Sequence, residues 1–373
     1  MLKVKQTLIG ALIVAFAISL FIPAGVSACT TICLKANDGA VVCGRTMEWG
    51  TFDLNSRVTI IPRGHEYLAV TPDGKKGVSW QTRYGVVGLD MMEQDTLTDG
   101  INEKGLYVTA LYHPGFAEYQ PYDPAQAKIS MGPNDWVKYV LSQFATVEEV
   151  REGLKKVRVV AILEPLIGNI PPPLHLMVTD KTGKSIVVEY LKGGLRVFDN
   201  PLHVMTNAPS YDWHMTNLRN YVNLSTNPFP ATKMEGVEFA PLGAGSGLLG
   251  IPGDYTPPSR FIRAVYYTQM ARKTPDGPET LYEVFRILDS FNLPLGSAEG
   301  SGQQERLKGM RSSTIWTSAA DTKNLVYYYH TQHNRKVRMV NLKGIDFTPK
   351  KSGMVHIPLD KQKSQDIEDV TPK

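Results

Sequence analysis

The chain has 373 residues, of which 42% are hydrophobic and 20% charged, and its 32 Gly and 25 Pro are ordinary for a compact globular protein. This composition excludes a fibrous or disordered chain, and the formal net charge of +4 does not indicate nucleic acid as a partner. Neither a repeat nor a low-complexity linker divides the chain. We therefore expect one folded domain over 29–359 and a polar tail over 360–373.

The first 28 residues have the pattern of a secretory signal peptide. Lys3 and Lys5 precede an apolar run from Leu8 to Ile22, and Val26-Ser27-Ala28 supplies small residues for cleavage. The apolar run is short for a membrane span, and no second run follows it. We expect a secreted or periplasmic protein whose mature chain begins at Cys29 and has no integral membrane span.

The three cysteines lie close together at this new terminus. Cys33 and Cys43 flank the turn signal Asn37-Asp38-Gly39, and a three-residue loop with Gly39 in the left-handed region pairs 33 with 43. The two side chains then form a local disulfide or pack as small hydrophobic residues, and the sequence leaves both open. No His lies nearby at ligand spacing, so we expect no metal.

The rest of the chain alternates between short strand signals and a few helical segments. We expect strands over residues 31–35, 40–47, 58–62, 106–113, 174–180, 185–191, 195–198, 314–318, 325–331 and 336–342. We expect helices over 136–157, 211–221, 259–272 and 279–291, with a capping box of Thr146 and Glu149 at a restart in the first. Without βαβ regularity, this order predicts an α+β domain of antiparallel sheets with helices outside.

Several familiar catalytic patterns can be set aside. Residues 245–250 match GxGxxG, but Pro252 and Gly253 follow where a nucleotide-binding helix should begin. GxSxG, HExxH and Walker A sequences do not occur. The Gly- and Pro-rich stretch from Asn223 to Asp254 is long for a loop and indicates a role in function or assembly.

Cys29 remains as the candidate nucleophile. A thiol has a reference pKa of about 8.5 and an α-amino group one of about 7.7 to 8.0, so a freed N-terminal amine is a suitable base for its own thiol. In the hairpin register above, Arg45 faces Thr31 and Met47 faces Cys29, so Cys29 and Arg45 share one face and the guanidinium favours thiolate. A two-residue loop would shift this register by one.

Two other interpretations of Cys29 exist. Small residues before a cysteine also form the processing site of bacterial lipoproteins, and acylation there would block both the thiol and the amine. The protein would then be a lipid-anchored, non-catalytic binding protein. Alternatively, Cys29 is a structural cysteine whose place at the processed terminus is a coincidence.

Separated blocks of sequence, in order, resemble the cholylglycine hydrolase family of N-terminal nucleophile hydrolases, which contains penicillin V acylases and conjugated bile acid hydrolases. The resemblance spans Cys29 to about Leu342. It rests on Cys29 itself, Gly44-Arg45-Thr46-Met47-Glu48-Trp49, residues 99–106, Met205-Thr206-Asn207-Ala208-Pro209 with Tyr211 and residues 216–219, residues 250–255, and Ser259-Arg260-Phe261.

The resemblance implies a role for each of six site residues. Cys29 attacks the amide carbonyl to form a thioester, beside Arg45, while Arg260 completes the charged surroundings. Glu48 occupies the position where the family has Asp, which holds the α-amine; its extra methylene shifts the carboxylate by roughly 1 Å. Asn207 and the backbone N–H of Tyr112 stabilise the oxyanion.

The same resemblance implies an αββα four-layer sandwich with no cofactor and no metal. The expected substrate is a small N-acyl amide, most of all one like penicillin V, because Tyr112 stands where bile-salt-cleaving members carry Asn. Bile salts and acyl homoserine lactones are the alternative substrates. In family members of this type, the segment matching Asn223 to Asp254 reaches across a subunit interface, which implies a homotetramer.

Overall fold

The computed structural model describes residues 29–50, 53–294, 298–299, 311–349, 353–361 and 365–372. The expected signal peptide, residues 1–28, lies outside the described residues. Among the described helices, none has both the length and the apolar character that a membrane crossing requires.

The first of two large antiparallel sheets is built around the N-terminal hairpin. Its strand order is β14-β1-β2-β18-β19-β20, with β17 also paired to β18. The strands are β1 (Thr30–Lys35), β2 (Val41–Trp49), β14 (Val204–Met205), β17 (Ala298–Glu299), β18 (Arg311–Asp321), β19 (Val326–Thr331) and β20 (Arg338–Asn341).

The second large sheet has the order β13-β12-β11-β8-β7-β6-β3-β21. Its strands are β3 (Arg57–Ile61), β6 (Val86–Met91), β7 (Thr96–Asn102), β8 (Tyr107–Tyr112), β11 (Leu174–Thr179), β12 (Ser185–Leu191), β13 (Gly194–Asp199) and β21 (Val355–Pro358). Two-stranded pairs lie outside it: β4 (Glu66–Val70) with β5 (Lys76–Gln81), β9 (Ser130–Met131) with β10 (Arg158–Val159), and β15 (Thr232–Met234) with β16 (Val237–Phe239).

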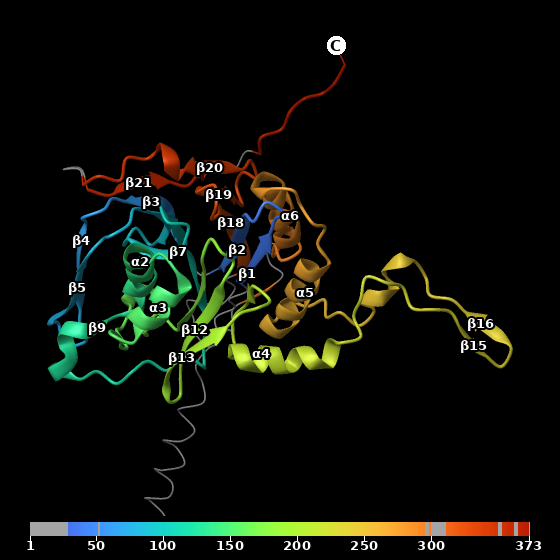
Figure 1. Ribbon diagram of the computed structural model, residues 1–373, viewed down its shortest axis with the longest axis horizontal. Helices are drawn as coiled ribbons and strands as arrows, with labels where there is room; N and C mark the ends of the chain where they lie inside the picture. The colour runs from blue at the N-terminus through green and yellow to red at the C-terminus, as the bar shows by residue number, and fades with distance from the viewer. Residues whose placement is uncertain are drawn as a thin grey trace, which may run out of the picture.

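Helices cover the outer face of each sheet (Figure 1). Helices α2 (Pro133–Gln143) and α3 (Val147–Leu154) pack on the second sheet, and α5 (Pro257–Met270) and α6 (Gly277–Asp289) on the first. Helix α4 (Tyr211–Asn217) follows β14, and the 3-10 turns are η1 (Pro124–Ile129), η2 (Pro165–Ile167), η3 (Leu218–Tyr221), η4 (Ala244–Leu248) and η6 (Leu342–Gly344). The expected αββα sandwich is confirmed.

Helix positions follow the sequence pattern closely, including the expected restart between α2 and α3. Thr146 is the N-cap of α3, where its hydroxyl accepts from the Glu149 N–H at 3.2 Å, and the Glu149 carboxylate accepts from the Ala145 N–H at 2.8 Å. The first bond is that of the predicted capping box, whereas the Glu149 side chain bonds one residue before the N-cap, at Ala145. These two bonds divide this segment into two helices, although its apolar periodicity continues without a break.

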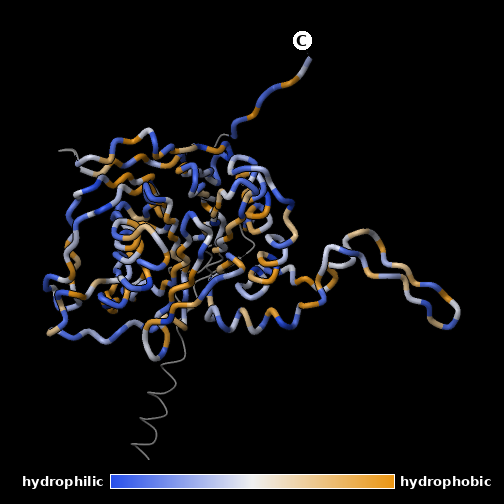
Figure 2. Tube along the Cα trace, in the orientation of Figure 1, coloured by the Kyte–Doolittle hydropathy of each residue, from blue (hydrophilic) through white to orange (hydrophobic). Residues whose placement is uncertain are grey.

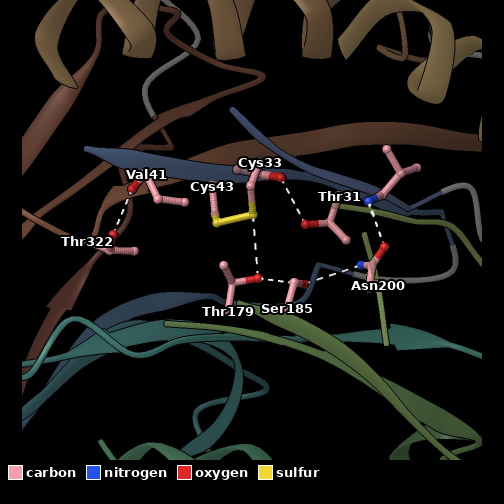
Figure 3. Close-up of a disulfide and its surroundings, with 10 residues drawn as sticks. Thr31, Cys33, Val41, Cys43, Thr179, Ser185, Asn200 and Thr322 are labelled. Carbon is pink, nitrogen blue, oxygen red and sulfur yellow. Dashed lines mark hydrogen bonds between the residues drawn. A yellow bond between two sulfur atoms is a disulfide. The ribbon is translucent and has the colours of Figure 1, made fainter. Parts of the chain in front are cut away.

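The N-terminal hairpin has the predicted register. Thr31 faces Arg45 and Cys33 faces Cys43, and Gly39 adopts a φ of +85° in the turn. Cys33 and Cys43 form a disulfide, which decides the alternative that the sequence left open. The bridge lies on the face directed at the second sheet, where Thr179 Oγ1 is 3.6 Å from Cys33 Sγ (Figure 3). Because side chains on one strand alternate between faces, Arg45, two residues after Cys43, and Cys29, four residues before Cys33, also point between the sheets.

Strands β4 to β7 and β21 were not predicted from the sequence, and neither were the short strands β9, β10 and β14 to β17. Gly85, Gly88 and Gly100 interrupt the apolar pattern here, and a Cβ at Gly88 would lie 2.2 Å from the Asp99 carbonyl oxygen. Glycine is thus required here because two strand backbones approach closely, and not because the chain turns. A search for turn signals therefore takes these glycines for loop residues. Strand β21 extends the second sheet to residues just before the predicted polar tail.

The long segment from Asn223 to Asp254 projects from the body of the protein as an arm that carries the β15–β16 hairpin (Figure 1). Hydrophobic residues recur along it (Figure 2), and Met234, Phe239 and Leu242 are among its exposed side chains. The glycine-rich match at 245–250 lies at η4 near the base of the arm, which agrees with its interpretation as a loop.

Candidate active site

A pocket lies between the two sheets beside the first described residue. Apolar side chains make most of its wall, and four of the six predicted site residues, Cys29, Arg45, Glu48 and Tyr112, line it. The remaining lining residues are Met47, Trp49, Leu54, Met91, Thr96, Leu97, Thr98, Ala110, Ile167, Pro172 and Leu174. Such a pocket can bind an apolar acyl group while polar groups meet at one end.

Cys29 is buried and stands outside the disulfide. Its backbone is fixed by Arg260, a fully buried residue of α5, which donates from Nη1 to the Cys29 carbonyl and, at 2.9 Å, to Thr30 Oγ1. Burial lowers the pKa of Arg260 to about 10, although Glu48 and Cys29 oppose that shift. The guanidinium therefore stays charged at neutral pH beside the start of β1.

Arg45 approaches Cys29 from the other side, in the space between the sheets. It donates to the main-chain oxygens of Ala110 at 2.7 Å and Thr98 at 3.3 Å, and its guanidinium lies 5.3 Å from the centre of the Trp316 ring. Burial acts to lower the pKa of Arg45, but nearby negative groups, Cys29 first, outweigh it and raise that pKa. Arg45 and Arg260 thus place two guanidinium groups near Cys29.

Glu48 is completely buried near the end of β2. Its Oε1 accepts from Thr314 Oγ1 at 2.7 Å, while Oε2 has no hydrogen-bond partner within the described part of the chain. Burial raises the pKa of Glu48 to about 7, against the opposing effects of Thr314 and Arg260. Thr46 faces Thr30 in the register, so Glu48, two residues further along β2, lies just beyond the level where β1 begins.

Asn207 links Arg260 to the edge of the second sheet. Its Oδ1 accepts from Arg260 Nη2, and its Nδ2 donates to the Tyr112 carbonyl, both at 2.7 Å. The N–H and C=O of one strand residue point to the same side, so the Tyr112 N–H is also directed away from β11 and toward this site. The side chain of Tyr112 packs edge-on against Trp49, with ring centroids 6.4 Å apart.

The structure thus brings together all six residues singled out from the sequence, although they come from β2, β8, α5, the residue before β1 and the segment after β14. Sequence reasoning missed a second group behind Asn207, formed by His113, His175 and Glu189. These residues are buried and adjoin Tyr112, Leu174 and the Asn207 loop. Their wide and irregular spacing gives no motif that a sequence search could have found.

Two groups of described residues bring three metal-capable side chains within 4.8 Å of one another. In the first, the rings of His113 and His175 are parallel within 6° and stacked at 4.2 Å. Ligand lone pairs lie in the ring planes, and two stacked parallel planes do not meet at a metal. In the second group, Arg57 already binds both Asp90 and Asp95. Neither arrangement suits a cation.

Comparison with known proteins gives one consistent result. The family model of linear amide C–N hydrolases, the choloylglycine hydrolase family, matches residues 29–355. The chain is 36% identical over 317 residues to the bile salt hydrolase/transferase of Clostridium perfringens, covering 84% of this chain and 92% of that protein. It is 25% identical over 329 residues to the penicillin V acylase of Pectobacterium atrosepticum, covering 83% and 79%.

Solved structures agree. A variant of the conjugated bile acid hydrolase from Clostridium perfringens superposes with a TM-score of 0.78 at 32% identity, covering 92% of this chain and 100% of that chain. The penicillin V acylase of Agrobacterium tumefaciens gives a TM-score of 0.69 at 24% identity, covering 88% and 90%, and this second likeness concerns the fold alone.

Proposed function

The chain belongs to the choloylglycine hydrolase family of linear amide hydrolases, and we propose that it cleaves N-acyl amides with Cys29 as its N-terminal nucleophile. The observation that carries this proposal is the meeting of Cys29, Arg45, Asn207 and Arg260 beside an apolar pocket that Cys29 and Arg45 line. Removal of residues 1–28 is part of the proposal, because only then does Cys29 have a free amine.

The proposed reaction has two steps. The α-amine of Cys29 accepts the thiol proton, and the thiolate attacks the carbonyl carbon of the substrate amide. The carbonyl oxygen then becomes an oxyanion. Asn207 Nδ2 and the Tyr112 N–H donate to that oxygen. The protonated amine then gives its proton to the departing nitrogen, and water hydrolyses the thioester to release the acid.

Glu48 fits the role of amine holder. Its Oε2 is buried, has no hydrogen-bond partner in the described part of the chain, and lies just beyond the level where β1 begins. An ammonium group at the freed terminus would supply the missing partner and favour the ionised carboxylate. We expect processing to lower the pKa of Glu48 from its value of about 7 in the uncleaved chain.

For the acyl group we propose a compact aromatic acyl chain such as that of penicillin V. The supporting observation is Tyr112, whose ring lines the pocket against Trp49. Conjugated bile salts are the second candidate, because the 36% identical relative from Clostridium perfringens carries that activity in its name. Acyl homoserine lactones share the same scissile bond and form the third.

A substrate panel tests this proposal. Protein that begins at Cys29 is assayed for kcat/KM with penicillin V, glycine- and taurine-conjugated bile acids, and acyl homoserine lactones. We expect the highest value for penicillin V. A preference for bile acids would refute that assignment but keep the amidase, whereas no hydrolysis of any of these amides would refute the proposed function.

Export and processing are tested by intact mass. We expect the exported protein to begin at a bare Cys29, secreted or in the periplasm. A diacylglyceryl mass on Cys29 would instead identify a lipid-anchored binding protein and exclude the mechanism.

We further propose that the arm formed by residues 223–254 mediates assembly into a homotetramer. Its hydrophobic side chains are exposed in the single chain, with Leu242 at 100% and Met234 at 56%. Burying such residues against another copy is favourable. Light scattering should give the tetramer mass for the intact protein and a smaller mass when the arm is shortened. A monomeric intact protein would refute the assembly.

A further inference from the structure

A buried polar group lies directly behind the loop that carries Asn207. The Glu189 carboxylate accepts from the Tyr211 N–H at 3.1 Å, and its Oε1 lies 2.9 Å from His175 Nδ1. His175 stacks on His113, whose Nε2 is 3.2 Å from the Pro209 carbonyl oxygen. All three members, Glu189, His175 and His113, have side chains exposed by 1% or less.

These contacts hold the backbone of the loop at two points, the Pro209 carbonyl and the Tyr211 N–H. A carbonyl oxygen only accepts, so His113 Nε2 carries the proton, and Tyr211 is held two residues further on. A third bond joins His214 Nε2 to the Asn207 carbonyl at 3.0 Å. The loop is therefore held through its main chain, while the Asn207 side chain is left to make its own contacts.

His113 also joins the two groups that form the oxyanion site. It follows Tyr112 directly, and its own N–H donates to the Pro173 carbonyl at 2.6 Å, which fixes the end of β8. Its side chain reaches the Asn207 loop at the same time. His113 thus links the Tyr112 backbone to the loop from which Asn207 extends, in addition to the direct bond from Asn207 Nδ2 to the Tyr112 carbonyl.

We propose that His113, supported by His175 and Glu189, is a positioning residue that holds the two oxyanion donors at the spacing the reaction requires. This inference rests on the proposed function. The group does not touch the substrate pocket, whose lining residues include neither His113 nor Glu189. Its loss therefore affects the transition state more than substrate binding, since a displacement of about 1 Å in a positioned group can cost 100-fold in rate.

Two substitutions at His113 separate positioning from packing. His113→Phe keeps a ring to stack on His175 but removes the donor to Pro209. His113→Gln restores an N–H donor at the position of Nε2. His330→Phe is the matched control, because His330 is also buried, lies outside the site and packs at a tilt against Phe285, with ring centroids 5.3 Å apart.

The readouts are kcat, KM and the inhibition constant of an aldehyde analogue of the acyl group, which adds to the Cys29 thiol and places its oxygen where the oxyanion forms. For His113→Phe we expect kcat to fall by about 30-fold and the aldehyde to bind more weakly by a similar factor, with KM within about 2-fold. His113→Gln should recover most of both, and His330→Phe should match the parent protein.

Unchanged kcat and aldehyde affinity in His113→Phe would overturn the inference, as would a His113→Gln variant that is equally impaired. If His113→Phe does not fold, His113→Asn provides the same test, because its shorter amide does not reach the Pro209 carbonyl that His113 Nε2 approaches at 3.2 Å. Wild-type turnover is measured first. Its absence would refute the proposed function and not this inference.

Discussion

Replacing Asn207 by Asp tests the oxyanion site with little change of shape. The carboxylate keeps an acceptor for Arg260 Nη2, which Asn207 Oδ1 binds at 2.7 Å, but it has no donor for the Tyr112 carbonyl or for an oxyanion. Removing one oxyanion donor costs about 10²- to 10³-fold in kcat, or about 2.7 to 4 kcal/mol. The Asp oxygen that replaces Nδ2 faces the Tyr112 carbonyl, so two acceptors meet there at a cost of about 1 to 3 kcal/mol of stability, which the charged pair with Arg260 offsets in part.

The assay is steady-state hydrolysis of the preferred amide by protein that begins at Cys29, together with thermal unfolding. We expect a large fall in kcat, KM within about 2-fold and a melting temperature lowered by only a few degrees. Asn341→Asp is the matched control, because Asn341 caps η6 by accepting from the Lys343 N–H at 3.1 Å, which Asp can also do. A folded Asn207→Asp enzyme that loses less than about 10-fold in kcat would refute the assigned role.

Three further predictions concern the nucleophile, the buried carboxyl and the disulfide. Cys29→Ser should lose at least about 100-fold in turnover and keep its circular dichroism spectrum, and full activity would exclude the mechanism. Because burial raises the pKa of Glu48 to about 7, its contribution to stability is complete below about pH 4.5 and is lost as pH rises toward 7. The uncleaved parent should therefore lose on the order of 3 kcal/mol of unfolding free energy relative to Glu48→Gln between pH 5 and 8, and parallel denaturation curves would contradict this. Replacing both Cys33 and Cys43 by Ala should cost about 2 to 3 kcal/mol in urea unfolding but leave kcat nearly unchanged, and equal unfolding midpoints would show that the bridge does not stabilise the protein.

The hairpin shows how much local sequence can predict. A three-residue turn with Gly39 is sufficient to set the register, and the register places Thr31 opposite Arg45 and Cys33 opposite Cys43. Whether two facing cysteines are oxidised depends on their geometry and on the redox compartment, so the sequence left this open. The capping box at Thr146 is a second case in which neighbouring residues decide the structure.

Long-range contacts account for what the sequence could not predict. Asn207 and Arg260 were found only through resemblance to a family, because nothing in their own neighbourhoods indicates that Arg260 Nη2 binds Asn207 Oδ1. The family resemblance did not point to His113, His175 or Glu189. Each of these residues lies in or beside a strand of ordinary composition, and only the pairing of β8, β11 and β12 brings them together.

The central claim, that Cys29 carries the acyl group during turnover, can be tested most directly by trapping the intermediate. Protein that begins at Cys29 is mixed with its preferred N-acyl amide, quenched in acid during turnover and analysed by intact mass and peptide mapping. The account predicts an added mass equal to the acyl group, located on the peptide that begins at Cys29. The account would be contradicted if an active enzyme carried the acyl group on another residue. It would also be contradicted if no acyl group were found on the enzyme under conditions where acylation is faster than hydrolysis.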